Sequence, residues 1–249
     1  MNFVKNYPHQ PAVAFNSLDE LKENLDKESK LCFYYPTVPN KRRDESSIEI
    51  MKHFPNSVML FEKPSHNNSS DAKAYMKSME ENGLKGNRLL VGMHCYLHEG
   101  FQKILELVEK NKSDITDISC AFNYPKDPHD PSSARVYDKA HGGAMLDLGV
   151  YVFESMRQIL KILGTNLHSF DKEKKNIWIK NTVEKVDIEL TANLNYGDYK
   201  VYLETKINPG SDPKEEIVIT LKNGDKITAN LFVHWQDSCG VFIEHANGT

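Results

Sequence analysis

The chain has 249 residues, enough to bury a substantial core in one large domain or in two modest ones. Its 31 Lys and Arg residues nearly balance its 35 Asp and Glu residues, and with a formal net charge of -4 and no long basic run it is not expected to bind nucleic acid. The N-terminus lacks an apolar signal core and the chain lacks a run of 18 apolar residues, which predicts a cytoplasmic protein without membrane contact.

The cysteines are few and widely spaced. No two of them form a C-x-x-C pair, so their spacing favours reduced thiols over a disulfide framework or a zinc site. The four are Cys32, Cys95, Cys120 and Cys239. This usage is typical of a reducing compartment.

Helical and strand patterns alternate along the first part of the chain. Leu18, Leu21 and Leu25 recur at helical spacing within residues 17–30, and the apolar run at 30–36 is typical of a strand ended by a proline. The alternation continues with a helix at 44–54, a strand at 56–64, a helix at 69–82 and a strand at 86–97. Such alternation predicts a parallel sheet with right-handed crossovers.

From residue 99 onward the pattern changes. A helix at 101–111 leads to a strand at 116–125, and a second helix is predicted at 141–160. The rest of the chain alternates apolar and polar residues around two turns, NYGD at 195–198 and NGD at 223–225, as antiparallel hairpins do. The second half is therefore predicted to be a mainly antiparallel sheet with a helix packed on one face.

Lys63 follows Glu62 and precedes Pro64 at the carboxyl end of a predicted parallel strand. Open α/β sheets bind their ligands at that end. A lysine there can hydrogen-bond a substrate hydroxyl and stabilise the alkoxide that develops from it. The alternative is a solvated lysine beside a turn proline.

Asp147 and Tyr151 are four residues apart, so on a helix they project from one face and can meet a common ligand. Gly142 and Gly143 remove side chains just before them and let another group approach the backbone. A tyrosine near a positive charge can pass a proton to and from a hydroxyl. The alternative is a tyrosine whose hydroxyl caps a core contact, with Asp147 as an acid at the helix start.

Two further groups of polar residues are weaker candidates for a binding site. His94 and His98 have a spacing that metal ligands can use, but no third ligand stands at convincing spacing, so no metal is expected. Arg42 and Arg43 could reach a phosphate or a sugar, although a solvated helix start is the preferred interpretation of them.

Four segments, taken in order, resemble the glucose–fructose oxidoreductase, inositol dehydrogenase and MocA family, usually written Gfo/Idh/MocA. They are YYPTVPN at 34–40, FEKP at 61–64, VGMHCYLHEGFQKILELVE at 91–109 and HGGAMLDLGVYVFESMRQIL at 141–160. The last of these is similar to the family's GGGxLxDxGxY/H helix start. With His94 and His98, the tyrosine version looks most like the branch of dihydrodiol and D-xylose dehydrogenases.

The resemblance implies an NAD(P)-dependent oxidoreductase acting on a sugar, a polyol or a related secondary alcohol. It assigns catalytic roles to Lys63, to Tyr151 as acid and base, and to Asp147 as a substrate-orienting carboxylate. It also implies that the cofactor, NAD or NADP, is bound by Pro36, Pro39, Asn40, Glu62 and Lys63.

The expected fold class is α/β, with two domains. An incomplete Rossmann-type parallel sheet at 1–98 is followed by an α+β domain with a mainly antiparallel sheet at 99–249, which serves substrate binding and dimerisation. Alternating strands at 186–194 and 217–233 predict an apolar face too large to leave in water. A homodimer would cover it.

The sequence departs from the family pattern in three places. No G-x-G-x-x-G occurs, so about the first fifty residues of a full member, and with them the pyrophosphate cradle, are expected to be missing. His141 replaces the first glycine of the family's GGG, and Tyr96 stands where close relatives carry an arginine. These departures leave open an inactive chain, or a non-catalytic regulatory or degenerate family member that has lost cofactor binding.

Overall fold

The computed structural model describes residues 15, 17–28, 30–35, 41–85, 88–133, 136–138, 142–182, 185–230 and 240–246. The chain divides into two compact units, Met1–Gly92 and Met93–Thr249, each with its own sheet and its own core. In the described part of the chain, no helix is both long enough and apolar enough to cross a membrane.

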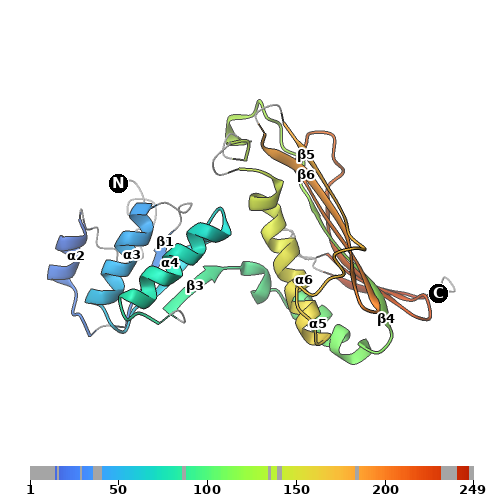
Figure 1. Cartoon of the computed structure of the whole chain (residues 1–249), viewed down its shortest axis with the longest axis horizontal. Coiled ribbons are helices and arrows are strands. Elements are labelled where there is room, and N and C mark those ends of the chain that lie inside the picture. The colour runs from blue at the N-terminus through green and yellow to red at the C-terminus, as the bar shows by residue number, and fades with distance from the viewer. Residues whose placement is uncertain are drawn as a thin grey trace. The chain divides into compact units, whose positions relative to one another are not determined.

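The first unit alternates helices and strands (Figure 1). Its elements are α2 (Leu18–Asn24), β1 (Cys32–Tyr35), α3 (Lys41–His53), β2 (Val58–Glu62), α4 (Ser69–Glu81) and β3 (Leu89–Gly92). The strands pair in the order β1-β2-β3, and both pairs are parallel. Tyr34, Leu60 and Leu90 are neighbours in one row across the three strands.

Helices α3 and α4 pack against one face of this sheet. The core between them consists of fully buried side chains from α3 and the residue that follows it, from β2 and from α4: Met51, Phe54, Met59, Phe61 and Met79. Strand residues in the other phase point away from the helices, and there Tyr34 and Leu90 are 52% and 51% exposed. The first unit thus has one well-packed face.

Polar side chains fix the ends of two helices in this unit. The Asn68 side chain accepts a hydrogen bond from the Asp71 N–H at 2.8 Å, which caps the start of α4. The Arg88 guanidinium donates to the carbonyls of Met51, Phe54 and Ser57 at 3.0, 2.8 and 2.8 Å. One arginine therefore binds one carbonyl in the last turn of α3 and two in the segment that follows it.

The second unit contains two long helices and a seven-stranded sheet. Its helical elements are η2 (His94–Leu97), α5 (Glu99–Asn111), η3 (Pro131–Ser133), the π-helical turn η4 (Met145–Gly149) and α6 (Val150–Ile162). Its strands are β4 (Ile115–Asn123), β5 (Asn176–Asn181), β6 (Asp187–Tyr196), β7 (Tyr199–Lys206), β8 (Lys214–Leu221), β9 (Lys226–Asn230) and β10 (Val241–Glu244). They pair in the order β10-β9-β8-β4-β7-β6-β5.

Strand β4 lies at the centre of this sheet. It runs parallel to β7 and antiparallel to β8, and all other neighbouring pairs are antiparallel. The sheet is therefore mainly antiparallel with one parallel pair.

Helices α5 and α6 lie along one face of the sheet, which we call the inner face (Figure 1). Alternate residues of β4, namely Ile118, Cys120 and Phe122, are buried beneath them. The predicted apolar face is therefore covered within the chain by its own helices. Helix α5 packs there beside α6. The homodimer itself stays a prediction.

The opposite, outer face carries polar side chains, and no described helix covers it. Glu204 accepts hydrogen bonds from the Asn123 amide at 2.5 Å and the Tyr202 hydroxyl at 2.6 Å, and its carboxylate lies 2.8 Å from the Lys206 ammonium. These contacts lower the pKa of Glu204 despite its burial, which alone would raise it. The Glu204 carboxylate is thus well supplied with donors at the centre of the outer face, although the side-chain oxygen of Asn123 is buried there without a partner among the described residues.

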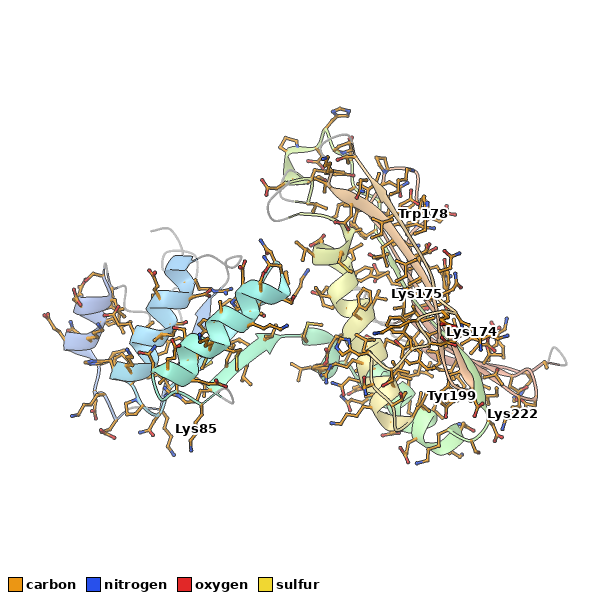
Figure 2. All side chains as sticks on the ribbon, in the orientation of Figure 1. Lys85, Lys174, Lys175, Trp178, Tyr199 and Lys222 are labelled. Carbon is orange, nitrogen blue, oxygen red and sulfur yellow. The ribbon has the colours of Figure 1, made fainter. Side chains whose placement is uncertain are left out.

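Strand β5 forms one edge of the sheet and is exposed along its whole length. Ile177, Trp178 and Ile179 are 48%, 49% and 49% exposed. Trp178 is the direct cross-strand neighbour of Thr191 on β6. Figure 2 shows the Trp178 side chain on the side of the sheet away from the helices.

The expected fold class is confirmed: a Rossmann-like α/β unit precedes a unit built on a mainly antiparallel sheet. The strand expected at 86–97 is shorter, however, since β3 ends at Gly92 and η2 follows. The chain enters the second unit there, and the Cys95 side chain is buried in the second core. Strand β5 was not predicted.

Candidate functional site

The segment from Gly142 to Tyr151 begins with a close approach between backbone and carboxylate. Gly143 has φ +108°, and a Cβ built on it would lie 2.1 Å from Asp187 Oδ1. Asp187 Oδ2 accepts the Met145 N–H at 2.7 Å. The group that the glycine admits is therefore a carboxylate of the same chain, and it caps the helix start.

Asp187 is one of the residues that the sequence analysis missed. It is the first residue of β6, and it lies far from Gly143 in the sequence. Burial raises the pKa of Asp187, while hydrogen bonds from the backbone of Met145 and Ala144 oppose the shift. No local sequence pattern links Asp187 to the glycines, so only the fold could have revealed this contact.

Asp147 and Tyr151 lie on one continuous helical segment, as predicted, but Asp147 falls within a π turn rather than an α-helix. Such turns occur frequently at functional sites. Asp147 is half-buried, and its backbone N–H donates to the Gly143 carbonyl at 3.0 Å. Tyr151 is 4% exposed, and its ring centroid lies 5.7 Å from that of Phe122 on β4. The structure thus places the two predicted residues of the second unit on one helical segment.

Lys63 is placed where the sequence predicts, directly after the carboxyl end of β2. The Glu62 carboxylate accepts hydrogen bonds from the Tyr34 hydroxyl at 2.7 Å and from the Lys63 N–H at 3.0 Å. The bond to Glu62 raises the pKa of Tyr34. The Lys63–Pro64 peptide bond is cis. Glu62 therefore holds the backbone on which Lys63 sits.

A buried charged cluster lies beside this strand end. The Arg43 guanidinium stacks 4.0 Å above the Phe61 ring and donates to Asp44 Oδ1 at 2.7 Å. It also lies 3.3 Å from His66 Nε2. The interpretation of Arg43 as a solvated helix start was wrong, because the aromatic ring and the carboxylate bury its charge within the unit.

Most of the remaining predicted site residues lie outside the part of the chain that the structure describes. Pro36, Pro39, Asn40 and His141 lie outside the described residues, as do the side chains of Arg42 and His94. The His98 ring accepts the Gly100 N–H at 3.3 Å and caps α5. In the described ranges, no three His, Cys, Asp or Glu residues form a group that could hold a metal ion.

The buried thiols of Cys95 and Cys120 are poor nucleophiles. Burial raises the pKa of Cys95 to about 11 and that of Cys120 still further, so both remain protonated at neutral pH.

A second residue that the sequence analysis missed is Glu215 on β8. The alternation of KEEIVITL places Glu215 in phase with Ile217 and Ile219, which are fully buried on the inner face. Its direct neighbour on β4 is Phe122, the residue that contacts Tyr151. The period of two was visible in the sequence and could have identified this carboxylate.

Comparisons with known proteins show the fold. No protein-family model and no curated protein matches the sequence. The UDP-N-acetylglucosamine 3-dehydrogenase GnnA from Acidithiobacillus ferrooxidans matches 94% of the chain with a TM-score of 0.64 and 15% identity. The aldose-aldose oxidoreductase from Caulobacter crescentus matches 97% with a TM-score of 0.70 and 13% identity.

A 3-ketoreductase from Actinomadura kijaniata, solved in complex with TDP-benzene and NADP, matches 99% of the chain with a TM-score of 0.64 and 16% identity. The chain spans 65%, 69% and 68% of the lengths of these three proteins. They are oxidoreductases of the Gfo/Idh/MocA type. The resemblance that the four sequence segments indicated is therefore confirmed at the level of the fold.

Proposed function

We propose that this chain is an NAD(P)-linked oxidoreductase of a sugar, a polyol or a related secondary alcohol. The observation that carries the proposal is the placement of Lys63 directly after the carboxyl end of a parallel strand, where open α/β sheets bind their ligands. In the second unit, taken by itself, Asp147 and Tyr151 lie on one helical segment. Lys63 would stabilise the alkoxide, Tyr151 would move the hydroxyl proton, and Asp147 would orient the substrate.

A nicotinamide cofactor fits the described residues in part. Glu62 and Lys63 lie at the end of the strand where open α/β sheets bind ligands, so they would hold its reacting end. The resemblance adds Pro36, Pro39 and Asn40 to this set. Asp187 already caps the start of η4, so that helix start does not offer its N–H groups to a pyrophosphate. When bound, NAD or NADP would supply the hydride chemistry.

An alternative function is a non-catalytic regulator or a degenerate protein that has lost cofactor binding. The observation that favours it is that no G-x-G-x-x-G occurs in these 249 residues. That motif is the usual source of the backbone N–H groups that hold a pyrophosphate, so the alternative predicts weak dinucleotide binding.

One experiment separates the two functions. The 249-residue chain is titrated with NADH and NADPH by calorimetry and assayed with NAD and NADP on D-glucose, D-xylose and myo-inositol. Turnover of any of these three compounds supports the oxidoreductase function. No turnover, together with a dinucleotide dissociation constant weaker than about 1 mM, would favour the non-catalytic alternative.

The proposal includes a homodimer and a cytoplasmic location. The outer face of the sheet, which none of the described helices covers, supports the dimer, with Trp178 and Phe242 at opposite edges, 49% and 56% exposed. The reduced cysteines Cys32, Cys95 and Cys120 support the reducing compartment. Light scattering should give twice the 28.5 kDa mass of one chain at micromolar concentration, and a mass equal to one chain would refute the dimer.

A further inference from the structure

Glu215 occupies a position on the inner face where the strand pattern calls for an apolar residue. It follows the phase of Ile217 and Ile219, both fully buried under the helices. Direct cross-strand neighbours share a face of the sheet, so Glu215 points to the same side as Phe122. A charged group has thus been placed at the edge of the apolar core.

One carboxylate oxygen of Glu215 lacks a partner. Oε2 is buried, and no group in the described part of the chain makes a hydrogen bond to it. Burial also raises the pKa of this carboxyl. A buried polar atom without a hydrogen bond is costly, and in native proteins such an atom calls for an explanation.

The surroundings of Glu215 connect it to the predicted substrate residues. In one row across the sheet, Glu215 neighbours Phe122, and Phe122 neighbours Thr205. The Phe122 ring contacts Tyr151, and the Thr205 hydroxyl donates to the Ala144 carbonyl at 3.3 Å. The row therefore passes beneath the helical segment that carries Asp147 and Tyr151.

We propose that Glu215 is a specificity-determining residue that accepts a hydrogen bond from a hydroxyl group of the bound sugar or polyol. This inference rests on the proposed function and deepens it by naming a contact for the substrate. An ionised carboxylate only accepts hydrogen bonds, and polyols are rich in hydroxyl donors. A phosphate at this position would be repelled, so the part of the substrate that meets Glu215 is uncharged.

The first arm of the test measures binding. Saturation-transfer NMR on the full 249-residue chain gives dissociation constants for D-glucose, D-xylose and myo-inositol in the wild type, Glu215→Gln and Glu216→Gln. Glu216 is the matched control, because it is the next residue of β8, faces outward and pairs with Lys214 at 2.8 Å. Glu215→Gln should weaken binding about 10- to 100-fold, and Glu216→Gln should leave it unchanged.

Deoxy analogues of the best-bound probe identify the hydroxyl concerned. Removal of that hydroxyl should weaken binding to the wild type but not to Glu215→Gln, since the contact is already lost in the variant. If the wild type binds a probe and Glu215→Gln binds it equally well, the role of Glu215 is overturned while the proposed function stands. If the wild type binds none of the three probes, both are overturned.

The second arm measures thermal unfolding without ligand. Glu215→Leu restores the apolar strand pattern and removes the unpartnered carboxylate, so its unfolding temperature should rise by a few degrees. Glu216→Leu should not raise it, because Glu216 is ion-paired on the outer face. A lower unfolding temperature for Glu215→Leu would mean that the carboxylate stabilises the fold, and this alone would overturn the proposal.

Discussion

Two half-buried glutamates, one in each unit, lie near the end of a strand but differ in how their carboxylates are satisfied. Glu62 ends β2, and both of its oxygens accept hydrogen bonds, one from Tyr34 and one from the Lys63 backbone. Glu215 lies near the start of β8, and its buried Oε2 has no partner within the described residues. The first carboxylate organises its own unit, whereas the second has a buried oxygen for which we propose a substrate hydroxyl as the hydrogen-bond donor.

The largest expected effect tests whether the carboxyl end of β2, where Glu62 holds the Lys63 backbone, serves catalysis. In an assay with the cofactor and polyol that the chain turns over, Lys63→Met should lower kcat/KM by about 10²–10⁴, because a positive charge near the alkoxide is lost. Lys85, which is exposed in the same unit and labelled in Figure 2, provides the control Lys85→Met, which should leave kcat/KM unchanged. A loss below about twofold for Lys63→Met would make Glu62 and Lys63 purely structural.

The next prediction concerns the capped helix start in the second unit. Gly143→Ala should lower the free energy of unfolding by about 2–4 kcal/mol, because its Cβ would collide with Asp187 in a backbone conformation that already disfavours side chains. Urea unfolding followed by circular dichroism measures the change. Gly197 also has a positive φ, +62°, but open space around it, so Gly197→Ala should cost only about 1 kcal/mol. Equal costs would show that Asp187 exerts no steric constraint.

The dependence of stability on pH tests whether the Glu215 carboxyl is buried without a partner. Burial raises the pKa of Glu215 above the ordinary value of 4.5, so the native state holds this proton more tightly than the unfolded chain does. The stability of the wild type relative to Glu215→Gln should therefore be greatest below pH 4.5 and fall as the pH rises through the raised pKa. Unfolding free energies of both proteins from pH 4 to pH 8 measure the difference. A constant difference would contradict the burial of this carboxyl.

The smallest expected effect comes from the satisfied carboxylate. Tyr34→Phe removes the donor to Glu62, and because Tyr34 is 52% exposed, water can replace the lost bond. The free energy of unfolding should fall by only about 0.5 kcal/mol. Tyr124 is similarly exposed, at 46%, and Tyr124→Phe serves as the control with no expected change. A cost above about 2 kcal/mol would show that Tyr34 is a major support of the Lys63 backbone.

Much of the fold follows from local sequence patterns. The helix Ser69–Glu81 and the hairpin around Asn223 and Gly224 were predicted because turn and periodicity patterns agree over short distances. Strand β5 was missed because it is an exposed edge strand in which three large apolar residues are consecutive, so no alternation marks it. An isolated apolar run gives no indication of which partner strand will accept it.

The site was predicted only where its residues are close in the sequence. Asp147 and Tyr151 were found from their spacing, yet the π turn around Asp147 was not, because its extra residue depends on packing against the sheet. Asp187 reaches Gly143 across the fold, so its role could not be derived from either segment alone. Glu215 was recognisable from its phase in β8, but the missing partner became visible only in three dimensions.

The central position of β4 has a consequence for the order in which the second unit can fold. Both neighbours of this strand, β7 and β8, are encoded after it, beginning about 75 and 90 residues beyond its end. On the ribosome, β4 is therefore synthesised with two unpaired edges and has to wait for most of the remaining chain. Non-local pairing of this kind slows folding, and open strand edges invite aggregation. Helix α5 is synthesised before β4 and packs on its inner face. It can therefore shield that face of the strand during the interval.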